Sequence, residues 1–162
     1  MPFVQVTAPV YEPAVRGLCV KPYPLHPKGC PNFGKKAGCP PEAPQLPRAF
    51  DLAGPCFLVY SAFDFAAHVS KMRLAHPDWS ERQVTCCLYW QGTARKQLEA
   101  EIDVFRLTHP GFLVERCPEA MGLNVTATLR AAGIEVEWPP VTRTLQVAFA
   151  ARPASPRPVQ ET

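Results

Sequence analysis

The proline and cysteine content of residues 18–55 is the feature that most constrains how this chain can fold. The stretch "GCPNFGKKAGCPPEAPQLP", residues 29–47, places two cysteines directly before proline and carries five prolines in all. Proline lacks a backbone N–H and fixes φ, so this stretch can form neither a regular helix nor a central strand. Because so long a loop is unusual in a compact domain, we expect something other than backbone pairing to hold it.

The prolines also indicate how the chain is organised. Of the 20 prolines in 162 residues, most lie in residues 1–55 and 138–162, and residues 56–137 hold few. An apolar content of 47% is sufficient for one buried core. We therefore predict a single α/β domain over residues 1–151, with residues 18–55 as its metal-binding loop segment and residues 152–162 as a disordered tail.

Hydrophobic patterns predict the elements of that domain. One helix should begin after Asp64 and stop before His76, and a capping box at Ser80–Gln83 should open one long amphipathic helix that ends near Thr108. A third helix should be capped by Asn124 and closed by Gly133. The order of elements predicts the α/β class, with a small mixed β-sheet packed against two to three helices. The expected strands are residues 3–7, 57–62, 111–116, 134–138 and 142–151.

Charge and targeting signals argue against several classes of partner. The net charge is +3 without a long basic run, and Lys35-Lys36 is the only lysine pair, so we expect no nucleic-acid binding. The N-terminus lacks a signal-peptide pattern and no run of 18 apolar residues occurs, so we expect a cytoplasmic protein without a membrane span. In a reducing compartment, seven cysteines do not favour a disulfide scaffold.

Three cysteines of the proline-rich segment are candidate metal ligands. Cys19, Cys30 and Cys39 lie in a segment without an apolar framework in which thiols could pack. A bound metal would supply the missing constraint, since its binding free energy becomes folding free energy. Their spacing, Cys19-x10-Cys30-x8-Cys39, lacks the close ligand pair of most zinc sites. Iron–sulfur clusters do not require such a pair, and bacterial ferredoxin ligand runs end in Cys-Pro.

The remaining cysteines and the histidines divide into weaker candidates and packing residues. Cys117 precedes Pro118 after a predicted strand, which makes it the candidate fourth ligand. His26 leaves a mixed Cys–His site open. We expect three cysteines to pack as small apolar side chains, and three histidines to lie at the surface or at helix ends. These residues are Cys56, Cys86 and Cys87, and His68, His76 and His109.

At these motifs the chain resembles a family of small prokaryotic proteins described as predicted metal-binding proteins. The family's hallmark is Cys-Pro-x-Tyr/Phe-Gly followed by Cys-Pro-Pro, which here reads "CPNFG" from Cys30 and "CPPEAP" from Cys39. A later family motif reads "PEAMGLNV" from Pro118. Members carry a further cysteine cluster before that motif, and this chain keeps only Cys117 there. The resemblance implies that the first loop binds a metal or an iron–sulfur cluster, and it implies no particular reaction.

Two functional hypotheses follow, and a third has less support. The first is a protein that carries one iron–sulfur cluster of the 4Fe–4S type on Cys19, Cys30, Cys39 and Cys117. It would act in electron transfer or cluster-linked sulfur and redox chemistry, with a redox partner protein or within a larger complex. The second is a zinc-stabilised interaction module whose tryptophan-containing stretches "HPDWS" and "VEWPP" bind a partner. The third is a metal-free cysteine enzyme that uses His26 as its base. Whether the protein is an enzyme stays open, because a cluster held by three cysteines would leave one iron free to bind substrate.

Overall fold

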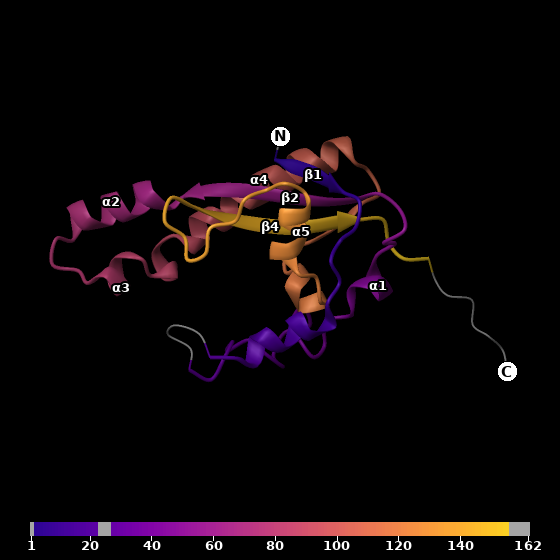
Figure 1. Ribbon diagram of the computed structural model, residues 1–162, viewed down its shortest axis with the longest axis horizontal. Helices are drawn as coiled ribbons and strands as arrows, with labels where there is room; N and C mark the ends of the chain where they lie inside the picture. The colour runs from indigo at the N-terminus through magenta and orange to yellow at the C-terminus, as the bar shows by residue number, and fades with distance from the viewer. Residues whose placement is uncertain (1, 23–26, 156–162) are drawn as a thin grey trace.

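The computed structural model describes residues 2–22 and 27–155, which form a four-stranded sheet with helices on both faces (Figure 1). The strands are β1 (Phe3–Val6), β2 (Cys56–Asp64), β3 (Leu113–Glu115) and β4 (Arg143–Ala151), in the order β1-β2-β4-β3. This confirms the α/β class. The three pairings are antiparallel, so the sheet is not mixed as predicted. β2 and β3 run in the same direction, but β4 lies between them and separates them.

One face of the sheet is covered by α4 (Gln91–Thr108). Its buried residues, Ala94, Leu98, Ile102 and Phe105, recur at helical spacing. Three of them, Leu98, Ile102 and Phe105, pack against β2 and β4, where the small side chains of Ala148 and Ala150 let the helix approach closely. The predicted apolar stripe over this part of the chain is confirmed.

The opposite face is covered by α5 (Val125–Ala131) and α1 (Leu46–Ala49), which pack on Leu58 and Phe149. The predicted limits of the α5 helix are confirmed. The Asn124 side chain accepts a hydrogen bond of 2.9 Å from the Ala127 N–H, and Gly133 follows the last turn with φ of +76°.

The helices α2 (Phe65–Ala75) and α3 (Glu81–Val84) extend beyond one end of the sheet (Figure 1). Both predicted caps are confirmed: the Asp64 side chain accepts from the Ala67 N–H, and Ser80 and Gln83 form a reciprocal capping box.

The prediction of one long helix from Ser80 to Thr108 is wrong. The chain leaves α3 after Val84, forms the short 3-10 helix η2 (Cys87–Tyr89), and enters α4 only at Gln91. The Trp90 indole N–H donates to the Thr85 carbonyl at 3.2 Å, and the Tyr89 N–H bonds to Cys86 instead. A continuous helix would have needed that Thr85 carbonyl as the acceptor for Tyr89.

The predicted strand over residues 134–138 is also wrong. The Glu137 carboxylate accepts hydrogen bonds from the backbone N–H groups of Val141, Thr142 and Arg143 and from the Thr142 hydroxyl. These bonds fold the segment into a loop that leads into β4. The following prolines, Pro139 and Pro140, have no N–H to give to a neighbouring strand.

The N-terminal segment crosses the body of the protein beside the 3-10 helix η3 (Pro118–Met121). The Glu12 N–H donates to the Gly122 carbonyl at 2.7 Å, and the Asn124 N–H donates to the Val10 carbonyl at 2.8 Å. A further 3-10 helix, η1 (Pro13–Val20), follows. Residues 27–45 then form turns without helix or strand, and α1 comes next. An unbroken loop over residues 18–55 is therefore not confirmed, because η1 and α1 occupy parts of it.

The first residues of the predicted tail are ordered against α1. The Arg152 carbonyl accepts from the Asp51 N–H at 2.9 Å, and the Ala154 N–H donates to the Ala49 carbonyl at 3.0 Å. The rest of the predicted disordered tail, residues 156–162, lies outside the described residues.

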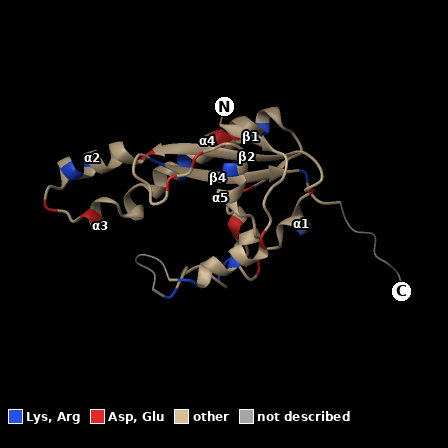
Figure 2. Ribbon diagram, in the orientation of Figure 1, with Lys and Arg blue, Asp and Glu red and all other residues tan. Residues whose placement is uncertain are grey.

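Basic and acidic residues are interspersed along the chain (Figure 2). Within residues 2–22 and 27–155, no helix combines the length and the apolar character needed to cross a membrane.

Candidate functional site

The structure places Cys30 and Cys39 near enough to Cys19 to act on its thiol electrostatically. Cys19 lies near the end of η1, and the other two lie in the turns that follow. Burial raises the pKa of the Cys19 thiol, and repulsion from Cys30, Cys39 and Glu119 raises it further. Coulombic effects of this kind fall with distance, so these groups share one neighbourhood.

Cys117 belongs to the same neighbourhood although it lies far away in the sequence. It precedes η3 and is exposed at the surface. Desolvation by the surrounding protein raises the pKa of its thiol, and repulsion from Glu115, Glu119 and Cys39 raises it further, whereas Arg95 lowers it. Cys39 acts electrostatically on both Cys19 and Cys117, and so connects Cys117 with the three cysteines of the N-terminal segment. We call Cys19, Cys30, Cys39 and Cys117 the cysteine group.

Backbone contacts hold Cys19 and Cys30 beside each other. The Cys30 N–H donates to the Cys19 carbonyl at 2.7 Å. Gly29 is buried with φ of +82°, and a Cβ added there would lie 2.6 Å from the Cys19 carbonyl oxygen. Only glycine therefore permits this approach of the two segments.

The turn that carries Cys30 and Cys39 closes on itself. The Gly34 N–H donates to the Pro40 carbonyl at 2.8 Å, and the Ala43 N–H donates to the Cys39 carbonyl at 2.9 Å. These bonds satisfy backbone groups in a stretch whose prolines prevent helix and strand pairing, and they fix the positions from which the two thiols project.

Arg16 joins the segments on which the cysteine group depends. Its Nε donates to the Ala120 carbonyl at 3.0 Å, and its Nη2 donates to the carbonyls of Pro41 and Ala43 at 3.0 and 2.7 Å. One guanidinium therefore ties η1 to the Cys39 turn and to η3, which follows Cys117. Sequence reasoning missed Arg16, and no sequence signal could have indicated it, because a single arginine among scattered ones forms no motif.

The cysteines predicted to pack lie apart from this group. Cys56 is in the core at 1% exposure, and Cys87 packs against the cluster that contains Phe63 and Trp90. Cys86 is half-buried just before η2.

The three described histidines occupy different settings. His68 lies in the first turn of α2, and its Nε2 atom is buried beside Phe63 and Phe65. His76 stacks on Trp79 with ring centroids 3.8 Å apart, and His109 stacks on Phe105. His26, the alternative ligand and base, lies outside the described residues.

The side chains of the cysteine group are not arranged to coordinate a single metal ion. Among residues 2–22 and 27–155, no three His, Cys, Asp or Glu side chains form a group that could hold a metal ion. A single zinc ion requires its thiolates at about 2.3 Å from the metal. An iron–sulfur cluster distributes its thiolates over several irons, so its ligands can be farther apart. The donor set, four thiols that approach from separate segments, is chemically suited to the cluster.

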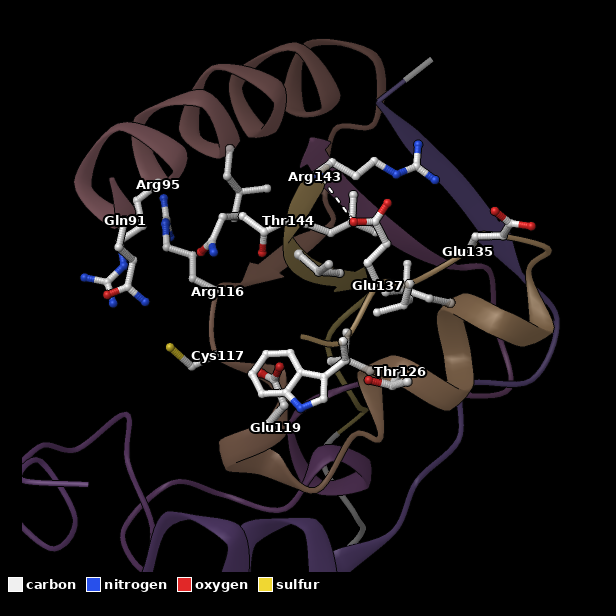
Figure 3. A pocket seen from close by; sticks show the side chains of 18 of the residues that line it. Gln91, Arg95, Arg116, Cys117, Glu119, Thr126, Glu135, Glu137, Arg143 and Thr144 are labelled. Atoms are coloured by element: carbon white, nitrogen blue, oxygen red, sulfur yellow. Dashed lines mark hydrogen bonds between the residues drawn. The ribbon is translucent and has the colours of Figure 1, made fainter. Parts of the chain in front are cut away.

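A cavity of about 550 Å³ adjoins Cys117. Its walls come from α4, the end of β3, the segment from η3 to α5, the loop at residues 135–138 and the start of β4, and no described residue before Gln91 lines it. Figure 3 shows Gln91, Arg95 and Arg116 gathered on the side where Cys117 lies, whereas Glu135 and Arg143 lie on the opposite side.

The charged groups of this cavity differ in how far they are compensated. The Arg116 guanidinium bonds both carboxylate oxygens of Glu99, with Nη2 to Oε2 at 2.6 Å, and these bonds lower the pKa of Glu99. Hydrogen bonds from Thr142 and its backbone neighbours lower the pKa of Glu137 to about 2. The Arg95 side chain, by contrast, makes no hydrogen bond or ion pair with any described residue.

No protein-family model matches this chain, and no curated protein or solved structure matches it. The resemblance to predicted metal-binding proteins therefore remains a prediction from the motifs at Cys30, Cys39 and Pro118.

Proposed function

We propose that this is a small iron–sulfur protein that holds one cluster, of the 4Fe–4S type, on Cys19, Cys30, Cys39 and Cys117. The observation that carries the proposal is that all four cysteines predicted as ligands share one neighbourhood, although Cys117 is far from the others in the sequence. Metal binding requires the thiolate form, so a cationic centre among the four thiols would stabilise the charged state that burial and electrostatic repulsion disfavour at Cys19 and Cys117.

Each part of the chain has a defined role in this proposal. The four thiolates would ligate the irons, and the glycine-bearing turns would let backbone N–H groups approach the cluster sulfurs. Arg16 would hold the three ligand-bearing segments in place. When bound, the cluster would supply one-electron transfer or cluster-linked sulfur chemistry. The protein would then serve a redox partner or a larger complex, in the cytoplasm.

The second candidate is a zinc-stabilised interaction module, and the exposed apolar side chains favour it. Trp138 is 86% exposed and Leu74 is 85% exposed. An exposed tryptophan can anchor an interface, because tryptophan is enriched among the residues that contribute most to binding. In this alternative the metal has a structural role only, and the protein has no catalytic activity.

Metal analysis of anaerobically purified protein distinguishes the two candidates. We expect iron and acid-labile sulfide in stoichiometric amounts, visible absorption, and an electron paramagnetic resonance signal on reduction. Cys30→Ala and Cys39→Ala should lose iron, whereas Cys86→Ala, a half-buried cysteine outside the group, should retain it. Stoichiometric zinc in colourless protein would support the interaction module instead, and equal iron in all three variants would remove the site assignment.

A further inference from the structure

The cavity beside Cys117 lies along an open edge of the sheet. β2 pairs with all of β4, but β3 pairs only with Phe149–Ala151. Within the described residues, no strand therefore covers residues 143–148 on the β3 side, and five of them, Arg143–Val147, line the cavity. Alternate backbone groups of this stretch face the cavity side and can bond a ligand.

The cavity offers apolar contact beside that edge. Leu98 is buried, Leu145 and Val147 are half-buried, and all three line it. The exposed Trp138 ring flanks the same space. A volume of about 550 Å³ lies within the range of roughly 300–1,000 Å³ typical of small-molecule sites.

Two arginines, Arg95 and Arg116, lie at the Cys117 end of the cavity, and a third, Arg143, lies at the opposite end (Figure 3). At the Cys117 end Arg116 is bound to Glu99, so Arg95 is the cation there whose donors are free for a ligand. A guanidinium presents a planar pair of donors that matches a carboxylate. Glu119, Glu135 and Glu137 also line the cavity and would repel a multiply charged anion. A ligand with a single carboxylate at Arg95 and an uncharged body limits that repulsion.

We propose that this cavity binds a small organic monocarboxylate, whose carboxylate is bound by Arg95 and whose apolar body lies along Leu98, Leu145 and Val147. The inference goes beyond the proposed cluster, and among the described residues the two sites share only Cys117, because the other three proposed ligands do not line the cavity. Bound there, the carboxylate end of the ligand lies beside Cys117.

The test uses three probes with one skeleton, 4-phenylbutyrate, 4-phenylbutylamine and 4-phenylbutanol, with the full-length protein. Binding is followed through the Trp138 indole N–H signal in a nitrogen–proton correlation spectrum, assigned with Trp138→Phe. We expect 4-phenylbutyrate to shift this signal and to bind more tightly than the alcohol, and the amine not to bind. No shift with millimolar 4-phenylbutyrate, or equal binding of the amine, would overturn the proposal.

Variants at Arg95 identify the carboxylate partner. Arg95→Gln should weaken 4-phenylbutyrate binding about tenfold or more, as expected for the loss of charge-assisted hydrogen bonds. Arg95→Lys should weaken it less. The matched control is Arg82→Gln, at an exposed arginine of α3 that lines no part of the cavity. Unchanged affinity in folded Arg95→Gln refutes the assignment, and if that variant does not fold, unchanged affinity in Arg95→Lys refutes it.

Iron content measured in the same samples separates this proposal from the previous one. Cys30→Ala should lack iron and still bind 4-phenylbutyrate, and Arg95→Gln should keep iron and lose the ligand. Wild-type protein that binds the ligand without ever containing iron would refute the cluster alone. Wild-type protein that contains iron and does not bind 4-phenylbutyrate would refute the cavity assignment alone.

Discussion

Replacing Arg16 with alanine tests whether one guanidinium holds the cysteine group together. The substitution removes three hydrogen bonds, to the carbonyls of Ala120, Pro41 and Ala43, and these three oxygens must then accept hydrogen bonds from water instead. A hydrogen bond to a charged group contributes about 1.5–3 kcal/mol. The Pro41 bond is exposed and contributes least, and freed carbonyls near the surface regain water. We therefore expect the opening of this region to become easier by about 2–4 kcal/mol in total.

Native-state hydrogen exchange measures this opening directly. The Cys30 N–H, bonded to the Cys19 carbonyl, reports on the segment that Arg16 fixes. A change of 2–4 kcal/mol corresponds to a loss of protection of roughly 30- to 1,000-fold. Arg48→Ala, at an exposed arginine of α1, should leave the Cys30 N–H protected. The measurement is made with and without chelator. If Arg16→Ala protein without metal keeps wild-type protection at Cys30, the structural role of Arg16 is refuted.

Two further substitutions test local features of the fold. Gly29→Ala should destabilise the protein more than Gly34→Ala: both glycines have positive φ, but only at Gly29 would an added Cβ meet backbone, 2.6 Å from the Cys19 carbonyl oxygen. In urea unfolding, Gly29→Ala should lose about 1–3 kcal/mol more stability than Gly34→Ala, and equal losses would contradict the close approach of the two segments. Burial lowers the pKa of His68 in the folded protein below its ordinary value of 6.5. As the pH falls below 6.5, the unfolded chain therefore takes up a proton at His68 before the folded protein does, and the free energy of unfolding decreases until the pH reaches the folded-state pKa. His68→Gln should flatten the dependence of urea unfolding on pH in this window, and an unchanged slope would show that His68 does not cause it.

Much of the local structure could be predicted because the signals and their partners lie within one helical turn. Asp64, Ser80 and Asn124 cap their helices through backbone N–H groups three residues ahead, so the sequence contains both halves of each interaction. The broken helix after Val84 could not be predicted in this way. Its cause is Trp90, which packs against Phe63 and Phe65 from distant parts of the chain and bonds the Thr85 carbonyl from there.

The candidate site also combines residues that local sequence signals predicted with an arrangement that depends on long-range contacts. The Cys-Pro steps and the absence of an apolar framework indicated Cys19, Cys30, Cys39 and Cys117 without any knowledge of the fold. Their shared neighbourhood depends on the pairing of residues 10–12 with residues 122–124, a long-range contact that periodicity does not encode. The cavity beside them could not be predicted either, because it exists only where β3 ends at Glu115 and leaves the edge of β4 uncovered.

Cys117 lies at the junction of the cysteine group and the cavity, and this predicts a coupling between them. Arg95 lowers the pKa of the Cys117 thiol, so a carboxylate bound at Arg95 should offset that effect and raise the pKa.

The rate of alkylation of the Cys117 peptide, followed against pH by mass spectrometry in metal-free protein, measures this pKa. Its midpoint should move to higher pH with saturating 4-phenylbutyrate and should not move in Arg95→Gln. A ligand that only blocks access would slow alkylation at every pH and leave the midpoint unchanged. That result would place the carboxylate away from Arg95, because a neutralised guanidinium cannot leave the thiol beside it with the same proton affinity.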